Sequence, residues 1–256
     1  MAKIFCIANQ KGGVGKTTTT VNLAAGLAKV GQRVLMVDLD PQGNATMGSG
    51  VDKRKLEMTI YDVLLESASI IEARVTSQKL IDGGCSYDVL GANRELAGAE
   101  VELVQLERRE KRLKLALAEV ADAYDFVLID CPPSLGLLTQ NAINASHSCL
   151  VTVQPESSAV VGLDTIFKVI NDIGKYSGRN VAVEGILFTM VEKNMVHDGF
   201  KKFVRDTYAN VKVFKTEIKK NVDVSKAQAM KEQLFNFKSK SVVAIAYDEL
   251  IDEILN

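Results

Sequence analysis

The chain has 256 residues, of which 47% are hydrophobic and 25% are charged, and its formal net charge is −1. This composition is typical of a soluble globular protein with a large core, and it excludes a repetitive or low-complexity chain. No signal peptide and no apolar run of 18 residues is present, so we expect a cytosolic protein with one domain over residues 1–256.

The first predicted element is a short apolar strand at residues 3–9, of the kind found in the centre of a parallel sheet. The run N-Q-K-G-G-V-G-K-T-T-T-T follows at residues 9–20, and a helical pattern covers residues 17–30. A glycine-rich loop between a strand and a helix lets backbone N–H groups surround a polyphosphate. We therefore predict that the phosphates of a nucleotide are bound by Lys11, Gly12, Gly13, Val14, Gly15, Lys16, Thr17 and Thr18.

Two lysines and a threonine give this loop its chemistry. Lys16 supplies a cation at the β- and γ-phosphates, and Thr17 offers a hydroxyl to Mg²⁺. The common loop has a glycine where this chain has Gln10, and here a second lysine, Lys11, precedes the glycine pair. The resulting K-G-G-x-G-K-T resembles the loop of the deviant P-loop ATPases, which include the ParA and MinD proteins. The resemblance implies a homodimer with ATP at its interface, in which Lys11 reaches the nucleotide of the other subunit.

Two further apolar runs end in carboxylates. The run R-V-L-M-V-D ends at Asp38, with Asp40 two residues later, and D-F-V-L-I-D-C delivers Asp130 ahead of P-P-S. Ligands bind at the C-terminal ends of strands in open α/β sheets, so we expect these carboxylates beside the loop. Asp130 is expected to hold a Mg²⁺-bound water and Asp38 to bind Mg²⁺ through water. Asp40 resembles the switch aspartate of the family and is expected to orient the attacking water, while capping of the turn before Pro41 is the alternative for both Asp38 and Asp40.

The remaining patterns alternate between helices and strands. We expect helices at residues 59–66, 69–75, 96 to about 121, 137–145 and 161–176, and strands at residues 87–90, 148–154 and 183–191. The charged stretch at 107–114 favours a solvated helix covering the sheet over a coiled coil. This alternation predicts an α/β fold with a doubly wound, mostly parallel sheet and helices on both faces. The run L-A-G-A-E at 96–100 resembles the chromosome-partition branch of the family.

Basic residues are concentrated late in the chain, where residues 190–240 carry 12 Lys and Arg against 6 Asp and Glu. If residues 198–208 form a helix, three of these cations share one face. An ordinary solvated face is the alternative. Partition ATPases bind DNA without sequence preference through this region, so the resemblance implies salt-dependent DNA contacts. The expected DNA-binding residues are Lys193, Lys201, Lys202, Arg205, Lys219 and Lys220.

Several other residues in this part of the chain have a predicted role. Phe200, Phe203 and Tyr208 fall at core-like spacing, so we expect them to pack and not to stack on bases. The lone histidines His147 and His197 have no second ligand at metal spacing, which favours surface or packing roles over metal or acid–base roles.

The chain departs from the family near the expected adenine site. Family members carry I-P-R-N, whereas this chain has Ile218-Lys219-Lys220-Asn221. Asn221 is retained as the expected nucleotide contact, and Lys220 can replace the charge of the arginine. Lys219 stands where a proline would fix the backbone. The stretch 226–240 also lacks the Gly-Lys-Pro turn of the family.

The last predicted helix separates two branches of the family. MinD-type proteins end in a basic amphipathic helix that lies on anionic lipid. Here that helix carries Asp248, Glu249, Asp252 and Glu253, so we expect no membrane partner. Because the first strand begins at Lys3, we also expect no preceding helix-turn-helix domain and no operator binding.

The resemblance implies a ParA/Soj-type partition ATPase, with Lys11, Lys16 and Asp40 as catalytic residues and ATP and Mg²⁺ as cofactors. Its dimer would bind DNA on the nucleoid, and its slow hydrolysis of ATP to ADP and phosphate would be stimulated by a ParB-type partner. One alternative is the same ATPase positioning another cargo, such as a chemoreceptor array or a microcompartment. Another is a DNA-bound regulator or scaffold in which hydrolysis is incidental.

A third alternative is an electron carrier resembling nitrogenase reductase, which shares the loop. It needs cysteines at strand ends that can hold a cluster. The chain has four widely spaced cysteines, which we expect to be buried thiols, and only one of them, Cys131, lies near such a place. The other three are Cys6, Cys85 and Cys149.

Overall fold

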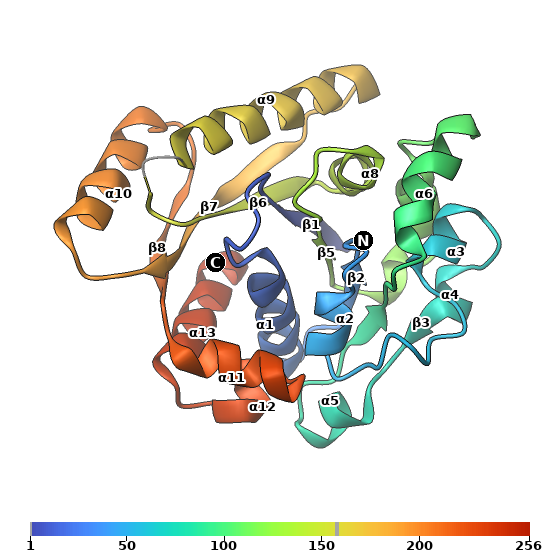
Figure 1. The fold of residues 1–256 in the computed structure, drawn as a ribbon, viewed down its shortest axis with the longest axis horizontal. Helices are drawn as coiled ribbons and strands as arrows, with labels where there is room; N and C mark the ends of the chain where they lie inside the picture. The colour runs from blue at the N-terminus through green and yellow to red at the C-terminus, as the bar shows by residue number, and fades with distance from the viewer. Residues whose placement is uncertain (1, 157–158) are drawn as a thin grey trace.

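A computed structural model describes residues 2–156 and 159–256 of the chain. Its centre is an eight-stranded sheet with the order β3-β4-β2-β5-β1-β6-β7-β8 (Figure 1). All neighbouring strands are parallel except β3 and β4, which are antiparallel, so the predicted doubly wound, mostly parallel sheet is confirmed. The strands are β1 (Lys3–Ala8), β2 (Val34–Asp38), β3 (Arg74–Val75), β4 (Asp88–Leu90), β5 (Phe126–Asp130), β6 (Ser148–Val153), β7 (Ala182–Val191) and β8 (Val213–Lys219).

The central strand β1 shows why the sequence reads as a continuous apolar run. Ile4, Cys6 and Ala8 point into one hydrophobic core, and Phe5 and Ile7 point into a second core on the opposite face of the sheet. A strand that is covered on both faces has no position for a polar side chain. The two cores therefore divide the helices into two layers.

The helices of the first layer pack on the core that contains Ile4. They are α3 (Ile60–Leu64), α4 (Ile70–Ala73), α6 (Leu96–Glu102), α7 (Arg112–Ala118), α8 (Leu137–Ala145), α9 (Ala159–Ser177) and α10 (Met195–Thr207). The second layer packs on the core that contains Phe5. Its helices are α1 (Lys16–Lys29), α2 (Asn44–Gly48), α5 (Gln78–Asp82), α11 (Val222–Met230), α12 (Leu234–Lys238) and α13 (Val242–Leu255). Short 3₁₀ helices occur at Leu103–Gln105 and Ala121–Ala123.

The long helix expected from residue 96 to about 121 is wrong. Helix α6 ends at Glu102, the chain turns through a left-handed residue, Arg108 (φ 54°), and α7 begins at Arg112. Residues 107–112 contain no apolar side chain, so they offer no face that a continuous helix could bury. The two short helices instead insert Leu96 and Leu113 separately into the same core.

Both edge strands were absent from the sequence predictions. The helix expected at 69–75 ends at Ala73, and β3 follows as a two-residue antiparallel strand beside β4. At the other edge, β8 buries alternate side chains only. The side chain of Glu253, from α13, binds the backbone of β8. Its carboxylate accepts hydrogen bonds from the backbone N–H of Lys215 (3.0 Å) and of Thr216 (2.7 Å).

The aromatic residues of the basic region pack only in part as predicted. Phe200 is buried against Phe188, and Tyr208 packs edge-on against Phe167, but Phe203 is 46% exposed. The prediction of a packing role is therefore wrong for Phe203, because it lies on the outer side of α10. Within residues 2–156 and 159–256, every helix is too short or too polar to cross a bilayer.

Candidate nucleotide-binding site

The phosphate loop connects β1 to the N-terminus of α1. Gly13 (φ 75°) and Gly15 (φ 78°) adopt left-handed backbone conformations that residues with a Cβ atom rarely adopt. Gly15 is the N-cap of α1, so the free N–H groups of the first helical turn face the space in front of the loop. This arrangement produces an anion site from backbone groups alone.

Two residues outside the predicted set hold the loop in place. The Asn9 side chain accepts a hydrogen bond from Lys11 N–H (2.9 Å) and donates to the Thr152 carbonyl on β6 (2.7 Å). The Thr189 hydroxyl on β7 donates to the Val14 carbonyl (2.9 Å). Asn9 precedes the glycine-rich motif directly, and Thr189 is 174 residues away from Gly15, so only Asn9 carried a local signal in the sequence.

The two lysines of the loop lie in different surroundings. Lys16 is only 6% exposed, and its ammonium donates to the Lys11 carbonyl (3.2 Å). Burial lowers the pKa of Lys16, although the nearby Asp130 carboxylate opposes this shift. Lys11 extends instead toward the surface, where its ammonium pairs with Glu156 and about two fifths of each side chain is exposed. Lys16 therefore points into the loop, whereas Lys11 is held by another part of the same chain.

The carboxylates at the ends of β2 and β5 lie side by side, because Asp38 and Asp130 are register partners. Asp130 accepts hydrogen bonds from the hydroxyls of Thr17 (2.7 Å) and Thr20 (3.0 Å). Asp38 accepts from Thr46 N–H (2.8 Å), Thr46 Oγ1 (2.7 Å) and Asp40 N–H (3.1 Å). Burial raises the pKa of Asp38 to about 6, and burial together with the charge of Asp38 raises the pKa of Asp130 to about 8.

A divalent cation fits these residues chemically. One hydroxyl and two buried carboxylates provide hard oxygen donors, which Mg²⁺ prefers. Among the described residues, no cationic side chain lies within hydrogen-bond distance of either carboxylate. Mg²⁺ usually keeps several waters and is held by one or two carboxylates together with phosphates of the substrate. Thr17, Asp38 and Asp130 would hold the ion from the protein side.

Replacing Asp130 with asparagine tests this account of the buried carboxylates. Because the pKa of Asp130 is raised in the folded state, its protonated form stabilises the fold. This contribution to the free energy of unfolding is complete below the pKa of the unfolded chain, near 4, and is lost as the pH rises through about 8. We expect Asp130→Asn to raise the melting temperature by roughly 2–4 °C at pH 8 and by less at pH 5. Nucleotide with Mg²⁺ should stabilise the variant less than the wild type. Thermal unfolding at both pH values measures both effects, and a lower melting temperature of the variant at pH 8 would contradict the account.

A cavity of about 450 Å³ opens in front of the loop. Its phosphate end is lined by Gly12, Gly13, Gly15, Lys16, Thr17 and Thr18, and Asp40 and Pro133 lie beside it. The other end has further lining residues that the sequence did not reveal, because they come from five separate elements and one connecting loop. These are Val21, Asn22, Asn44, Met47, Gly48, Met190, Val224, Ala227, Gln228, Glu232 and Leu234.

Asn221, the predicted adenine contact, lies outside the residues that line this cavity. Its side chain caps α11 by accepting a hydrogen bond from Asp223 N–H (2.7 Å). The neighbouring Lys220 pairs with Glu192 (2.7 Å). The structure therefore gives the Lys219-Lys220-Asn221 segment a role in starting α11.

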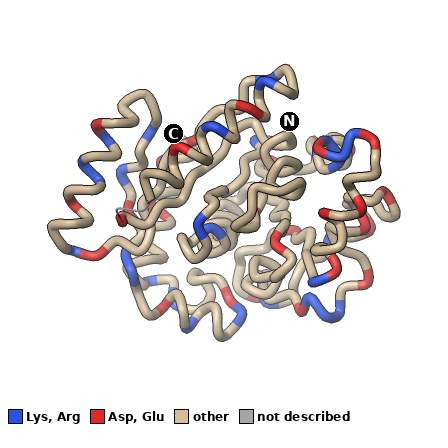
Figure 2. The backbone as a smooth tube through the Cα atoms, turned by 45° about the horizontal axis from the view of Figure 1, so that its top comes forward, with Lys and Arg blue, Asp and Glu red and all other residues tan. Residues whose placement is uncertain are grey.

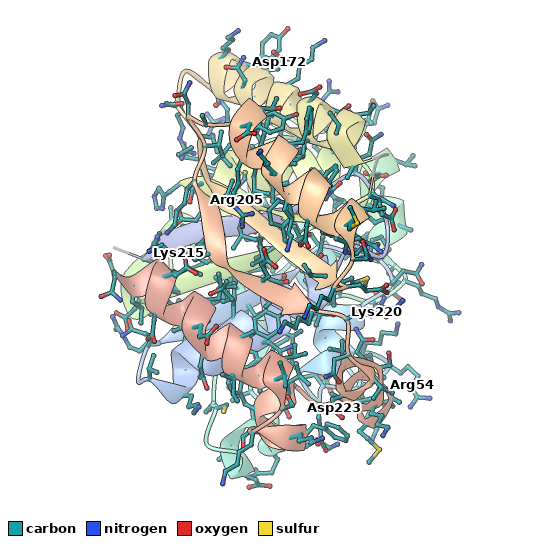
Figure 3. The ribbon with its side chains drawn as sticks, turned by 90° about the vertical axis from the view of Figure 1, so that its left-hand side faces the viewer. Arg54, Asp172, Arg205, Lys215, Lys220 and Asp223 are labelled. Carbon is teal, nitrogen blue, oxygen red and sulfur yellow. The ribbon has the colours of Figure 1, made fainter. Side chains whose placement is uncertain are left out.

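The predicted basic residues divide into two groups. Lys201 pairs with Asp198 and Glu217 and is 12% exposed, Arg205 also pairs with Glu217, and Lys220 pairs with Glu192. Figure 2 shows Asp and Glu interspersed with Lys and Arg along α10, and Figure 3 shows Arg205 on α10 and Lys220 beyond the end of β8. In the described part of the chain, no carboxylate pairs with the exposed Lys193, Lys202 and Lys219.

The histidines and cysteines take structural positions. His147 lies at the surface and accepts a hydrogen bond from Ile4 N–H (3.1 Å), whereas His197 is buried and accepts one from Glu192 N–H (3.0 Å). The two positions agree with the expected surface or packing roles. All four cysteines are buried, and Cys131 is 1% exposed. None of them stands at the surface, where a cluster shared between two subunits would need ligands.

Comparison with known proteins places this site in a family. A family model described as an AAA domain matches residues 2–183. The sporulation initiation inhibitor protein Soj of Bacillus subtilis strain 168 is 43% identical over 259 residues, which cover 99% of this chain and 98% of Soj. The chromosome partitioning protein ParA of Caulobacter vibrioides is 37% identical over 257 residues, which cover 99% of this chain and 94% of that protein.

The fold is also similar to that of solved structures. The crystal structure of cobyrinic acid a,c-diamide synthase from Mycobacterium smegmatis, with bound ADP and magnesium, has a TM-score of 0.86 and 35% sequence identity. The match covers 100% of this chain and 94% of that one. The activity in that name differs from partition, so this likeness concerns the fold and the nucleotide site. With the family model and the full-length similarity to Soj and ParA, the chain belongs to the ParA/MinD family of deviant P-loop ATPases, in the branch of the chromosome partition proteins.

Proposed function

We propose that the chain is a partition ATPase that works as an ATP-dependent dimerisation switch. The observation that carries this proposal is the convergence of the glycine loop, buried Lys16 and Asp40 on one cavity. The paired carboxylates Asp38 and Asp130 lie directly behind its lining, where they accept hydrogen bonds from Asp40 N–H and the Thr17 hydroxyl. Such a site binds a triphosphate with Mg²⁺ and aims cations at the transferred phosphoryl group. The similarity to Soj and ParA over nearly the whole chain supports partition as the process.

Each residue of the site has a role in this proposal. Backbone N–H groups and Lys16 bind the phosphates, and Mg²⁺, held from Thr17 and the two buried aspartates, neutralises charge on the phosphate oxygens. Asp40 lines the cavity next to the loop, where its carboxylate orients the attacking water. Lys11 leaves Glu156 and contacts the phosphates of the second subunit, which makes dimerisation depend on ATP.

The dimer binds DNA without sequence preference, a ParB-type protein stimulates hydrolysis, and hydrolysis releases the protein from the nucleoid. The exposed, unpaired Lys193, Lys202 and Lys219 are the cations best able to replace counterions on a phosphate backbone. Lys201, Arg205 and Lys220 would first have to break their ion pairs with glutamates before they could bind DNA phosphates. We therefore assign the main DNA contacts to the first group.

ATP-dependent DNA binding over a salt series tests the switch and the basic surface together. Neutralising Lys193, Lys202 and Lys219 together should weaken binding to unrelated duplexes equally and reduce the slope of log K against log salt by roughly 2–3. A control with the same charge change replaces three exposed lysines that lie elsewhere, namely Lys55, Lys114 and Lys175. Equal effects of the two triple variants would contradict the assignment of this surface.

Replacing Lys11 tests the dimer. We expect Lys11→Ala to abolish ATP-dependent association while the affinity of the monomer for ATP changes by less than about threefold, because Lys11 points away from its own loop. Sedimentation with and without ATP measures association. Lys3→Ala is a matched control, since Lys3 is similarly exposed and also pairs with a glutamate, Glu184. If the Lys11 variant associated at the same ATP concentrations as the wild type, the proposed contact of Lys11 across the interface would be refuted.

A further inference from the structure

One wall of the cavity, at the end away from the phosphates, is formed by one face of α11. Val224, Ala227 and Gln228 lie at the helical spacing i, i+3 and i+4, and all three line the cavity. The Gln228 side chain crosses from α11 to the loop, where Nε2 donates a hydrogen bond to the Thr18 hydroxyl (3.0 Å). This contact joins α11 to the residue that follows the Mg²⁺-binding threonine, Thr17.

A nucleotide whose phosphates occupy the loop extends its ribose and base past Thr18. The walls in that direction include the apolar side chains of Met190, Val224, Ala227 and Leu234. Such walls favour a flat aromatic ring but do not distinguish one purine from another. Discrimination needs a polar group with a fixed direction at the edge of the ring.

Two of the other polar side chains at this end already have partners. Asn22 donates to the Thr18 carbonyl (2.8 Å) and accepts from Leu234 N–H (2.8 Å). Glu232 pairs with Lys79 (3.1 Å). Asn44 of α2 also lines this end, but among the described residues no hydrogen bond fixes the direction of its amide. Gln228 is exposed as well, yet Thr18 holds its amide nitrogen while no donor of the described residues contacts its Oε1.

We propose that Gln228 selects adenine in the nucleotide site, an inference that rests on the proposed ATP binding. The bond from Nε2 to Thr18 fixes the amide, so Oε1 presents an acceptor to the base. The 6-amino group of adenine donates to this acceptor, whereas guanine and hypoxanthine present a carbonyl oxygen at position 6 and are repelled. Gln228 thereby replaces a base contact from Asn221, whose side chain caps α11.

The test compares the affinities of ATP, ITP and GTP for the wild type, Gln228→Met and Gln228→Ala in titrations with Mg²⁺. Methionine keeps the length and apolar body of the side chain without the amide. The wild type should bind ATP about 10- to 100-fold more tightly than ITP or GTP, the range expected for one specific base contact. In Gln228→Met the three affinities should agree within about threefold, with ITP bound as in the wild type.

Other outcomes have definite meanings. An unchanged ratio of ATP to ITP affinity in both variants would overturn the inference, as would an equal loss for all three nucleotides, which indicates a contact to the ribose. A wild-type preference for ITP and GTP that disappears in Gln228→Met would overturn the assignment of adenine. If the wild type bound none of the three triphosphates, the proposed function itself would fail, so the two failures are distinguishable.

Discussion

Replacing Lys16 with alanine should lower the affinity for ATP by about 100-fold or more, which is the effect expected from losing charge-assisted hydrogen bonds in a buried site. Lys16 is almost fully buried, and its ammonium lies over the loop, at the Lys11 carbonyl. In this position it meets the β- and γ-phosphates with little competition from water. Calorimetric titration with ATP and Mg²⁺ measures the loss.

The controls separate the charge of Lys16 from its packing. Lys16→Gln keeps most of the side chain without the ammonium and should lose nearly as much affinity as Lys16→Ala. Lys29→Ala removes an exposed lysine from the last turn of the same helix, where it pairs with Asp248, and should leave ATP binding unchanged. ATP binding by Lys16→Ala at the wild-type affinity would refute this account of the loop.

Replacing Asp40 should separate binding from hydrolysis. Asp40 lines the cavity beside the loop but, unlike Asp38 and Asp130, it is partly exposed. Asp40→Ala is expected to bind ATP within a few-fold of the wild type and to hydrolyse it about 100-fold more slowly, a typical loss for a residue that positions the reacting water. The variant should therefore remain as a dimer on DNA after the wild type has dissociated.

The same variant decides between the switch and a scaffold in which hydrolysis is incidental. Phosphate release and DNA dissociation are measured together, with Asp52→Ala as control, because Asp52 lies in the following turn and pairs with Arg54. The switch requires slower release from DNA and a defect in segregation for the Asp40 variant alone. Normal segregation by an Asp40 variant that cannot hydrolyse ATP would favour the scaffold.

The parts of the site that lie within one stretch of sequence were predictable. The loop, α1 and the two aspartates at strand ends follow from local patterns, because a buried parallel strand must be apolar and its C-terminal end faces the ligand. The contacts of Thr189 and Gln228 were not, since each depends on the approach of distant elements. A glutamine in a short helix of mixed composition carries no signal until α11 is seen against the loop.

The errors in the fold also have physical causes. Residues 96–121 combine good helix formers, but a stable helix must also bury an apolar face. The charged stretch in the middle offers no apolar face, so the helix is interrupted there. Strand β8 alternates Phe214, Thr216 and Ile218 inward with exposed lysines, which is the pattern of an edge strand. The roles of the predicted site residues stay predictions until the variants above are measured.

The carboxylate of Glu253 on the outer side of β8 has a consequence for assembly. It binds two neighbouring backbone N–H groups of the edge strand β8, where pairing with β7 is irregular, and the opposite edge of the sheet ends in a strand of only two residues. Neither side of the sheet is thus a template for adding another copy by strand pairing. Any higher-order array of these molecules on a nucleoid would have to form through side-chain surfaces or through the DNA itself, and it could then be dismantled subunit by subunit without breaking a continuous sheet.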